Sequence, residues 1–253
     1  AVMYTHALKC EARKNNRSFK YGADYRYAFV NYHEGVRHLA EFAPAQIYMA
    51  DLPIGALPNF AEDVRFLAEN GVRFERFEDH HPYTGELLES LTQLRDDGLL
   101  GFFELAGALE GRELDENELR CGTDIVYDNL IAGGEADHDE VKLLRETAHS
   151  EDFVCGITRL GSRLTELIKG GICKVELAQA LVEALESNGI EKMLSERGWD
   201  QLAEEWRQAV HDSEDRLMNC VYGLEFERPP GSLAELGGKA LGPGSDVPHA
   251  YPS

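Results

Sequence analysis

The chain has 253 residues, of which 43% are hydrophobic and 28% are charged, and its formal net charge is −21. This composition is typical of a soluble globular protein, and the acidity argues against a duplex-DNA binder, which normally has a basic face. No run of about 18 apolar residues occurs, so no transmembrane helix is expected. The cysteines are scattered and the first residues lack signal-peptide features, which together favour a reduced, cytoplasmic protein.

Residues 2–80 have the pattern of an α/β domain. Apolar, β-branched or aromatic composition predicts strands at 2–5, 27–32 and 45–50. Residues 72–78 alternate at period two and predict another strand, whereas residues 59–70 have helical spacing and end before Gly71. Strands separated by helical segments predict parallel βαβ units, that is, a parallel sheet with helices on both faces.

Residues 85–226 are predicted to be mainly helical. Apolar residues recur at helical spacing in 85–97, 174–194 and 199–224. From Pro229 the sequence becomes rich in glycine and proline. We therefore expect an α/β domain at 1–155, a helical region at 156–227, and a tail or incomplete substrate-binding piece at 228–253.

Polar side chains follow three of the predicted strands. His6 follows residues 2–5, Asp51 follows 45–50, and Asp79, His80 and His81 end or follow 72–78. In open α/β sheets ligands bind at this edge, where the strand order reverses. Carboxylates with imidazoles suit Mn²⁺ or another divalent cation, and two such cations could hold a phosphate and activate a water. Alone, His6 reads as a solvated or capping histidine and Asp51 as a turn residue.

Several motifs together resemble the DHH phosphoesterase superfamily, which includes exonucleases, oligoribonucleases, family II pyrophosphatases and exopolyphosphatases. The resemblance covers roughly residues 2–155. Its motifs are Tyr4-Thr5-His6, Ile47–Leu52, Asp79-His80-His81, Cys121–Tyr127 and His149–Phe153.

The resemblance implies a ligand set for Mn²⁺, or for another divalent cation such as Mg²⁺. Asp51 would bridge two metals, and His80 and Asp152 would complete one of the two sites. His6 would belong to the other site.

The resemblance also implies roles in catalysis for two neighbouring residues. His81 would contact the substrate phosphate. Asp79 would lie near the metals, where it would orient His80 or bind water.

The first motif departs from the family pattern His-x-Asp-x-Asp. Leu8 and Cys10 occupy the two aspartate positions, and Glu11 is one step out of register. One metal site is therefore depleted. Either Glu11 or Asp24 substitutes, or the protein binds one metal, or it has lost catalysis.

These features predict hydrolysis of a phosphodiester or phosphoanhydride by metal-activated water. The expected partner is a small phosphorylated substrate or a short single-stranded oligonucleotide, with no duplex nucleic acid and no membrane; a homodimer is left open. The alternative is a catalytically impaired relative that acts as a metal- or nucleotide-binding or assembly module.

Overall fold

The computed structural model describes residues 1–30, 35–53, 55, 57, 59–153, 158–187 and 189–223. Residues 1–206 form one compact unit, and the remaining residues belong to a second unit. The tail predicted at 228–253 lies outside the described residues.

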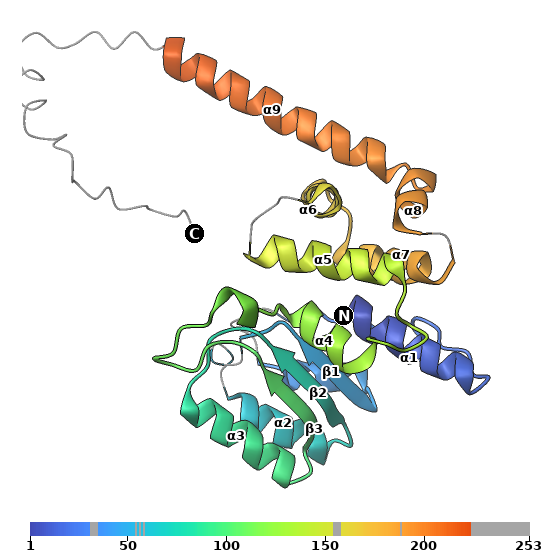
Figure 1. Cartoon of the computed structure of the whole chain (residues 1–253), viewed down its shortest axis with the longest axis vertical. Helices are drawn as coiled ribbons and strands as arrows, with labels where there is room; N and C mark the ends of the chain where they lie inside the picture. Colours follow the sequence, from blue (N-terminus) through green and yellow to red (C-terminus); the bar gives the residue numbers. More distant parts are fainter. Residues whose placement is uncertain are drawn as a thin grey trace, which may run out of the picture. The chain divides into compact units, whose positions relative to one another are not determined.

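A parallel sheet of three strands organises the first part of the chain (Figure 1). Its strands are β1 (Gln46–Ala50), β2 (Arg73–Asp79) and β3 (Leu100–Leu105), and they lie in the order β1-β2-β3. The connections contain helices α2 (Phe60–Glu69) and α3 (Gly85–Asp96). The α/β class, the parallel pairing, and the strands and helices predicted from residue 45 to 97 are therefore confirmed.

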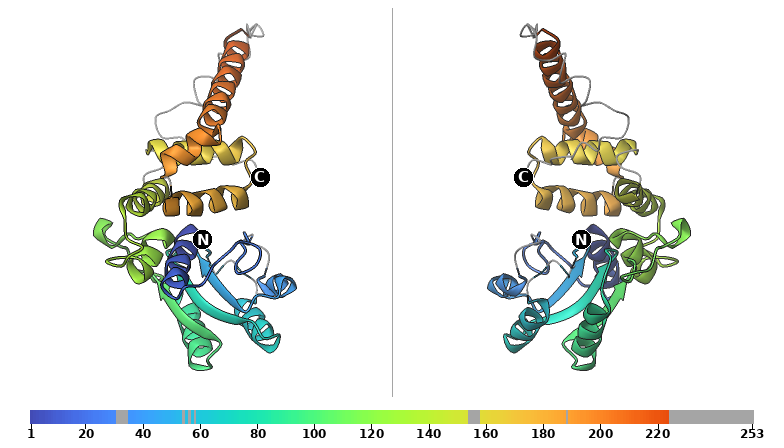
Figure 2. Two further views of the ribbon diagram at one scale, coloured as in Figure 1. Left: turned by 90° about the vertical axis from the view of Figure 1, so that its right-hand side faces the viewer. Right: turned by 90° about the vertical axis from the view of Figure 1, so that its left-hand side faces the viewer.

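Helices cover both faces of the sheet, as predicted (Figure 2). Successive side chains of a strand point to opposite faces. On one face Ile47 and Met49 belong to a core with α2 and α3, which also contains the fully buried Phe77. On the other face Tyr48 and Ala50 pack against a second core formed by helices.

The strand predicted at residues 2–5 is wrong, because these residues begin helix α1 (Val2–Lys14). Met3, Tyr4 and Ala12 are buried on this helix. The Tyr4 hydroxyl donates to the Met49 carbonyl oxygen at 3.2 Å, and Lys9 pairs with Glu186 at 2.7 Å. Tertiary packing on β1 and on the helical region thus outweighs the β-forming tendency of the first residues.

Two further differences concern strands. Residues 27–30 of the predicted strand 27–32 are not in a strand, and residues 31 and 32 lie outside the described part. Strand β3 falls inside the region predicted to be mainly helical.

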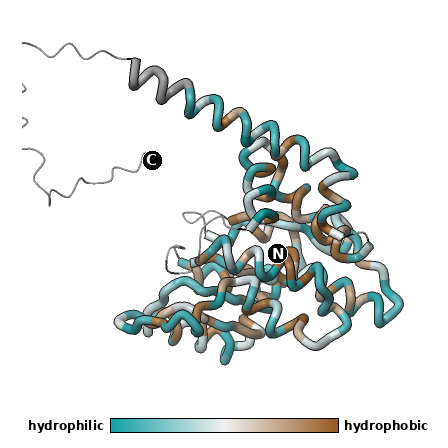
Figure 3. The backbone as a smooth tube through the Cα atoms, turned by 45° about the horizontal axis from the view of Figure 1, so that its top comes forward, coloured by the Kyte–Doolittle hydropathy of each residue, from teal (hydrophilic) through white to brown (hydrophobic). Residues whose placement is uncertain are grey.

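From residue 122 onward the described chain is mainly helical, as predicted. The helices are α4 (Gly122–Leu130), α5 (Asp139–Phe153), α6 (Arg159–Lys169), α7 (Lys174–Ser187), α8 (Ile190–Glu196) and α9 (Trp199–Gly223), with short 3₁₀ turns η1 (Arg37–Phe42) and η3 (Glu116–Glu118) earlier. Hydrophobic and hydrophilic segments are interspersed along the backbone (Figure 3). Helix α7 buries Leu177, Leu181 and Leu185. Within the described residues, no helix combines the length and apolarity needed to cross a membrane.

Candidate metal centre

Asp51 is the first residue after β1 and has a left-handed backbone conformation, with φ of 61°. Aspartate and asparagine tolerate this conformation better than other residues with a side chain. The Asp51 N–H donates to the Glu78 carbonyl oxygen at 3.0 Å, which ties the turn to β2. Asp51 therefore turns away from the strand direction at the carboxyl edge of the sheet.

His80 lies between two carboxylates. Its Nδ1 is 3.1 Å from Oδ1 of Asp51, and its Nε2 is 3.6 Å from Oδ2 of Asp152. Asp51 comes from the end of β1 and Asp152 from α5, so the ring connects the sheet to the helical part of the site. Nδ1 is buried and has no hydrogen-bond partner of acceptable geometry within the described structure.

Asp79 and His81 form a second contact in the same group. His81 Nδ1 lies 2.7 Å from Oδ1 of Asp79, whose side chain is only 5% exposed. The His80 and His81 rings lie 4.4 Å apart between centroids. Ligand atoms of Asp51, Asp79, His80 and His81 all lie within 4.8 Å of one another, so the structure brings these predicted residues together.

The charges of this group are coupled. Contact with Asp51 raises the pKa of His80, and the same contact holds the pKa of Asp51 below its usual range. Burial raises the pKa of Asp152, and the neighbouring Asp51 charge adds to this effect. Burial also raises the pKa of Asp79, against the opposing hydrogen bond from His81. Two carboxylates that share one imidazole need a positive charge between them, which a protonated ring or a cation can supply.

The loop after β3 supports the two histidines. The Ala106 N–H donates to the Asp79 carbonyl oxygen at 2.8 Å. A Cβ added at Gly107 would lie 2.0 Å from the His81 carbonyl oxygen and 2.4 Å from that of His80. Only glycine fits so close to this backbone, so the loop fixes the path of the chain through the site.

His6 is not brought into this group. It is buried on α1, where its Nε2 lies 3.1 Å from the Ala136 carbonyl oxygen and its ring packs edge-on against His138. The expected position depended on a strand ending at residue 5. Because α1 is a helix, the edge of the sheet does not set the position of His6.

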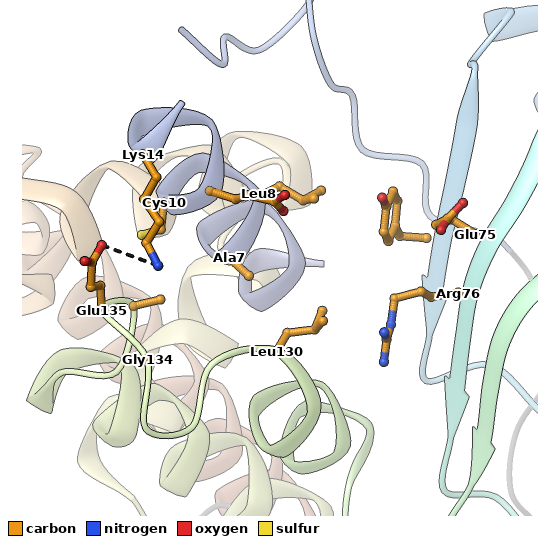
Figure 4. Close-up of a pocket in the computed structure, with 12 residues that line it drawn as sticks. Ala7, Leu8, Cys10, Lys14, Glu75, Arg76, Leu130, Gly134 and Glu135 are labelled. Carbon is orange, nitrogen blue, oxygen red and sulfur yellow. Dashed lines mark ion pairs between the residues drawn. The ribbon is translucent and has the colours of Figure 1, made fainter. Parts of the chain in front are cut away.

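Leu8 and Cys10, which replace the family aspartates, line a cavity of about 370 Å³. Figure 4 shows this cavity between α1 on one side and Arg76 of β2 on the other. Its rim includes an ion pair between Lys14 and Glu135, at 3.5 Å. Glu11, Glu75 and Glu135 also line this cavity, and among the described residues none of them belongs to a cluster of close metal-ligand atoms.

The motifs of the sequence resemblance contain Asp124 and His149 but give them no role, and sequence reasoning missed the group that they form with Arg145 beside the site. Asp124, in α4, accepts hydrogen bonds from Arg145 Nε at 2.7 Å and from His149 Nδ1 at 2.6 Å. Arg145, His149 and Asp152 are spaced by four and three residues, so they share one face of α5. That spacing was the available signal.

Comparison with protein-family models, with curated proteins and with solved structures finds no match to this chain.

Proposed function

We propose that this chain is a metal-dependent phosphoesterase of the DHH type. Its substrate would be a phosphodiester or phosphoanhydride in a short oligonucleotide or a small nucleotide. The observation that supports this proposal is the convergence of Asp51, Asp79, His80 and His81 at the ends of β1 and β2, with Asp152 against the far nitrogen of His80.

The residues present fit a divalent cation. Carboxylate oxygens and imidazole nitrogens are ligands suited to Mn²⁺. The buried His80 Nδ1 has no hydrogen bond of good geometry and lies 3.1 Å from Oδ1 of Asp51, so these two atoms could bind one cation together. Asp51 and Nδ1 of His80 would hold the cation, whereas Asp152 lies against the opposite nitrogen of the ring and does not belong to the four-residue group of ligand atoms. A bound Mn²⁺ or Mg²⁺ lowers the pKa of a water ligand and offsets the charge of a phosphate.

His81 would contact the substrate phosphate directly, and Asp79 would orient the His81 ring for this contact. The buried Asp79 carboxylate accepts from Nδ1 of His81 and thereby fixes the ring orientation. Nε2 of His81 is then the nitrogen left for a phosphate oxygen. The net charge of −21 disfavours the approach of a phosphate, so the local site must supply the attraction.

A separate observation supports a second candidate function. His6 forms a hydrogen bond with the Ala136 carbonyl group. Leu8 and Cys10 line a cavity and supply no carboxylate at the positions where the family has aspartates. The described site therefore offers ligands for one cation more readily than for two. A protein with one such site could bind a metal or a nucleotide without hydrolysing it.

The substitution Asp51→Asn tests the proposal. Asparagine tolerates the left-handed backbone at this position, so the change removes the charge without adding backbone strain. We expect Mn²⁺ binding, measured by calorimetry, to fall below detection while the circular dichroism spectrum is unchanged. Hydrolysis of short RNAs, dinucleotides, pyrophosphate and a generic phosphodiester should be lost as well.

The matched control is Asp96→Asn, which changes an exposed aspartate at the end of α3. It should bind Mn²⁺ like the unmodified protein. Unchanged Mn²⁺ affinity in Asp51→Asn would refute the metal assignment. Mn²⁺ binding by the unmodified protein, without hydrolysis of any substrate in the panel, would favour the second candidate.

A further inference from the structure

A second buried aspartate holds a histidine beside the candidate metal centre. His149 Nδ1 lies 2.6 Å from Oδ2 of Asp124, and the Asp124 side chain is only 3% exposed. Asp79 and His81 are built in the same way. In both pairs the carboxylate occupies Nδ1, so Nε2 is the nitrogen left for a ligand.

The Asp124 carboxylate is fully engaged by donors. Besides His149, it accepts from the Cys121 N–H at 3.0 Å and from Arg145 Nε at 2.7 Å. Burial alone would raise the pKa of Asp124, but the hydrogen bonds from His149 and Arg145 outweigh burial and lower it. An ionised carboxylate with several fixed donors restricts the rotation of each partner, so the orientation of His149 is well defined.

This pair adjoins the candidate metal centre. The Phe153 ring contacts both groups, with its centroid 4.9 Å from that of His149 and 6.0 Å from that of His80. At the start of α4, a Cβ on Gly122 would lie 3.0 Å from Cβ of Asp51. His149 is 40% exposed, so its ring is not sealed inside the protein.

The surroundings favour an anion over a second cation. Ligand atoms of Cys121, Asp124 and His149 do lie within 4.8 Å of one another. However, the Arg145 guanidinium already pairs with Asp124, and burial raises the pKa of the Cys121 thiol to about 12. A metal here would have to displace a fixed positive charge and deprotonate a buried thiol, and both steps are costly.

We propose that His149 is a substrate-contacting residue of the site, with Asp124 as its positioning residue. In the proposal, Nε2–H of His149 donates a hydrogen bond to an oxygen of the phosphate group that the site binds. His81 and His149 would then both contact this phosphate group. This inference rests on the proposed function, because it assigns a further contact to the same substrate.

The test measures two ligands separately on the full chain. Mn²⁺ binding is measured first, and inorganic phosphate is then titrated into the Mn²⁺-loaded protein. We expect His149→Gln to keep the Mn²⁺ affinity within about twofold and to weaken phosphate binding about 10- to 100-fold, as for one lost hydrogen bond to a charged group. The control His211→Gln, at an exposed histidine of α9, should change neither value.

The role of Asp124 is tested by a double-mutant cycle. Asp124→Asn should weaken phosphate binding when His149 is present and should have no further effect in the His149→Gln background. A merely structural role would give the same loss in both backgrounds. Circular dichroism and the melting temperature show whether each variant is folded, since Asp124→Asn leaves Arg145 with a weaker partner.

Each remaining outcome decides the inference. Unchanged phosphate affinity in a folded His149→Gln variant overturns it, as does loss of Mn²⁺ binding, which would make His149 a metal ligand. If the unmodified protein binds no Mn²⁺, the proposed function fails, and phosphate is titrated without metal. Dependence of that binding on His149 supports the inference, and independence from His149 overturns it.

Discussion

Gly107 offers a direct test of how the loop after β3 supports the site. A methyl group at this position would lie 2.0 Å and 2.4 Å from two backbone carbonyl oxygens, those of His81 and His80. Backbone atoms cannot rotate away as a side chain can, so Gly107→Ala must displace one of the two chain segments. Overpacking of this kind costs about 1–3 kcal/mol, and we expect the upper end because both clashes involve backbone.

The assay is urea denaturation followed by circular dichroism, together with a melting curve. For a chain of this size, about 3 kcal/mol corresponds to a fall of about 6–12 °C in the melting temperature. Mn²⁺ affinity should fall as well, because His80 moves with its own carbonyl group. The control is Gly85→Ala at the start of α3, where an added Cβ meets nothing within 4 Å and φ is ordinary. A free energy of unfolding for Gly107→Ala within about 0.5 kcal/mol of the unmodified value, which is usual for a neutral surface change, would refute the reasoning.

Two other predictions concern buried groups. Burial raises the pKa of the Cys121 thiol to about 12, so its thiolate is scarce from pH 7 to 9 and iodoacetamide should modify it far more slowly than the exposed Cys173. Peptide mass spectrometry of the native protein measures both rates, and equal rates would contradict the prediction. Phe77→Ala removes a fully buried ring of β2 and should lower the free energy of unfolding by about 3–5 kcal/mol. A loss under about 1 kcal/mol in urea denaturation would show that this side of the sheet is not a packed core.

The sequence predicted the centre of the sheet because its pattern there is local. Apolar alternation identified β2, and helical spacing identified α2 and α3. Pairing of Ala50 with Glu78 then places Asp51 next to Asp79, as expected for the carboxyl ends of neighbouring parallel strands. This is why Asp51 and the two histidines could be placed together without a structure.

The rest of the fold and the position of His6 could not be predicted, because they depend on tertiary contacts that no local sequence pattern encodes. Strand β3 is a short apolar run, which periodicity alone does not separate from a buried helix. Helix α1 is decided by packing against β1 and α7, and so is the position of His6. The described strands follow the order β1-β2-β3 without a reversal, so the site has no switch point among them. The other side of the site is formed by α5, which carries Asp152.

The left-handed backbone at Asp51 limits how this position can change over evolutionary time. Asparagine and glycine are the other residues that tolerate the conformation well, and each is one nucleotide away from an aspartate codon. Neither carries a charge. Random mutation can therefore remove the carboxylate from this site while the fold, the strand register and the packing survive. Any activity that depends on this carboxylate could therefore be lost in a single step while the scaffold is kept.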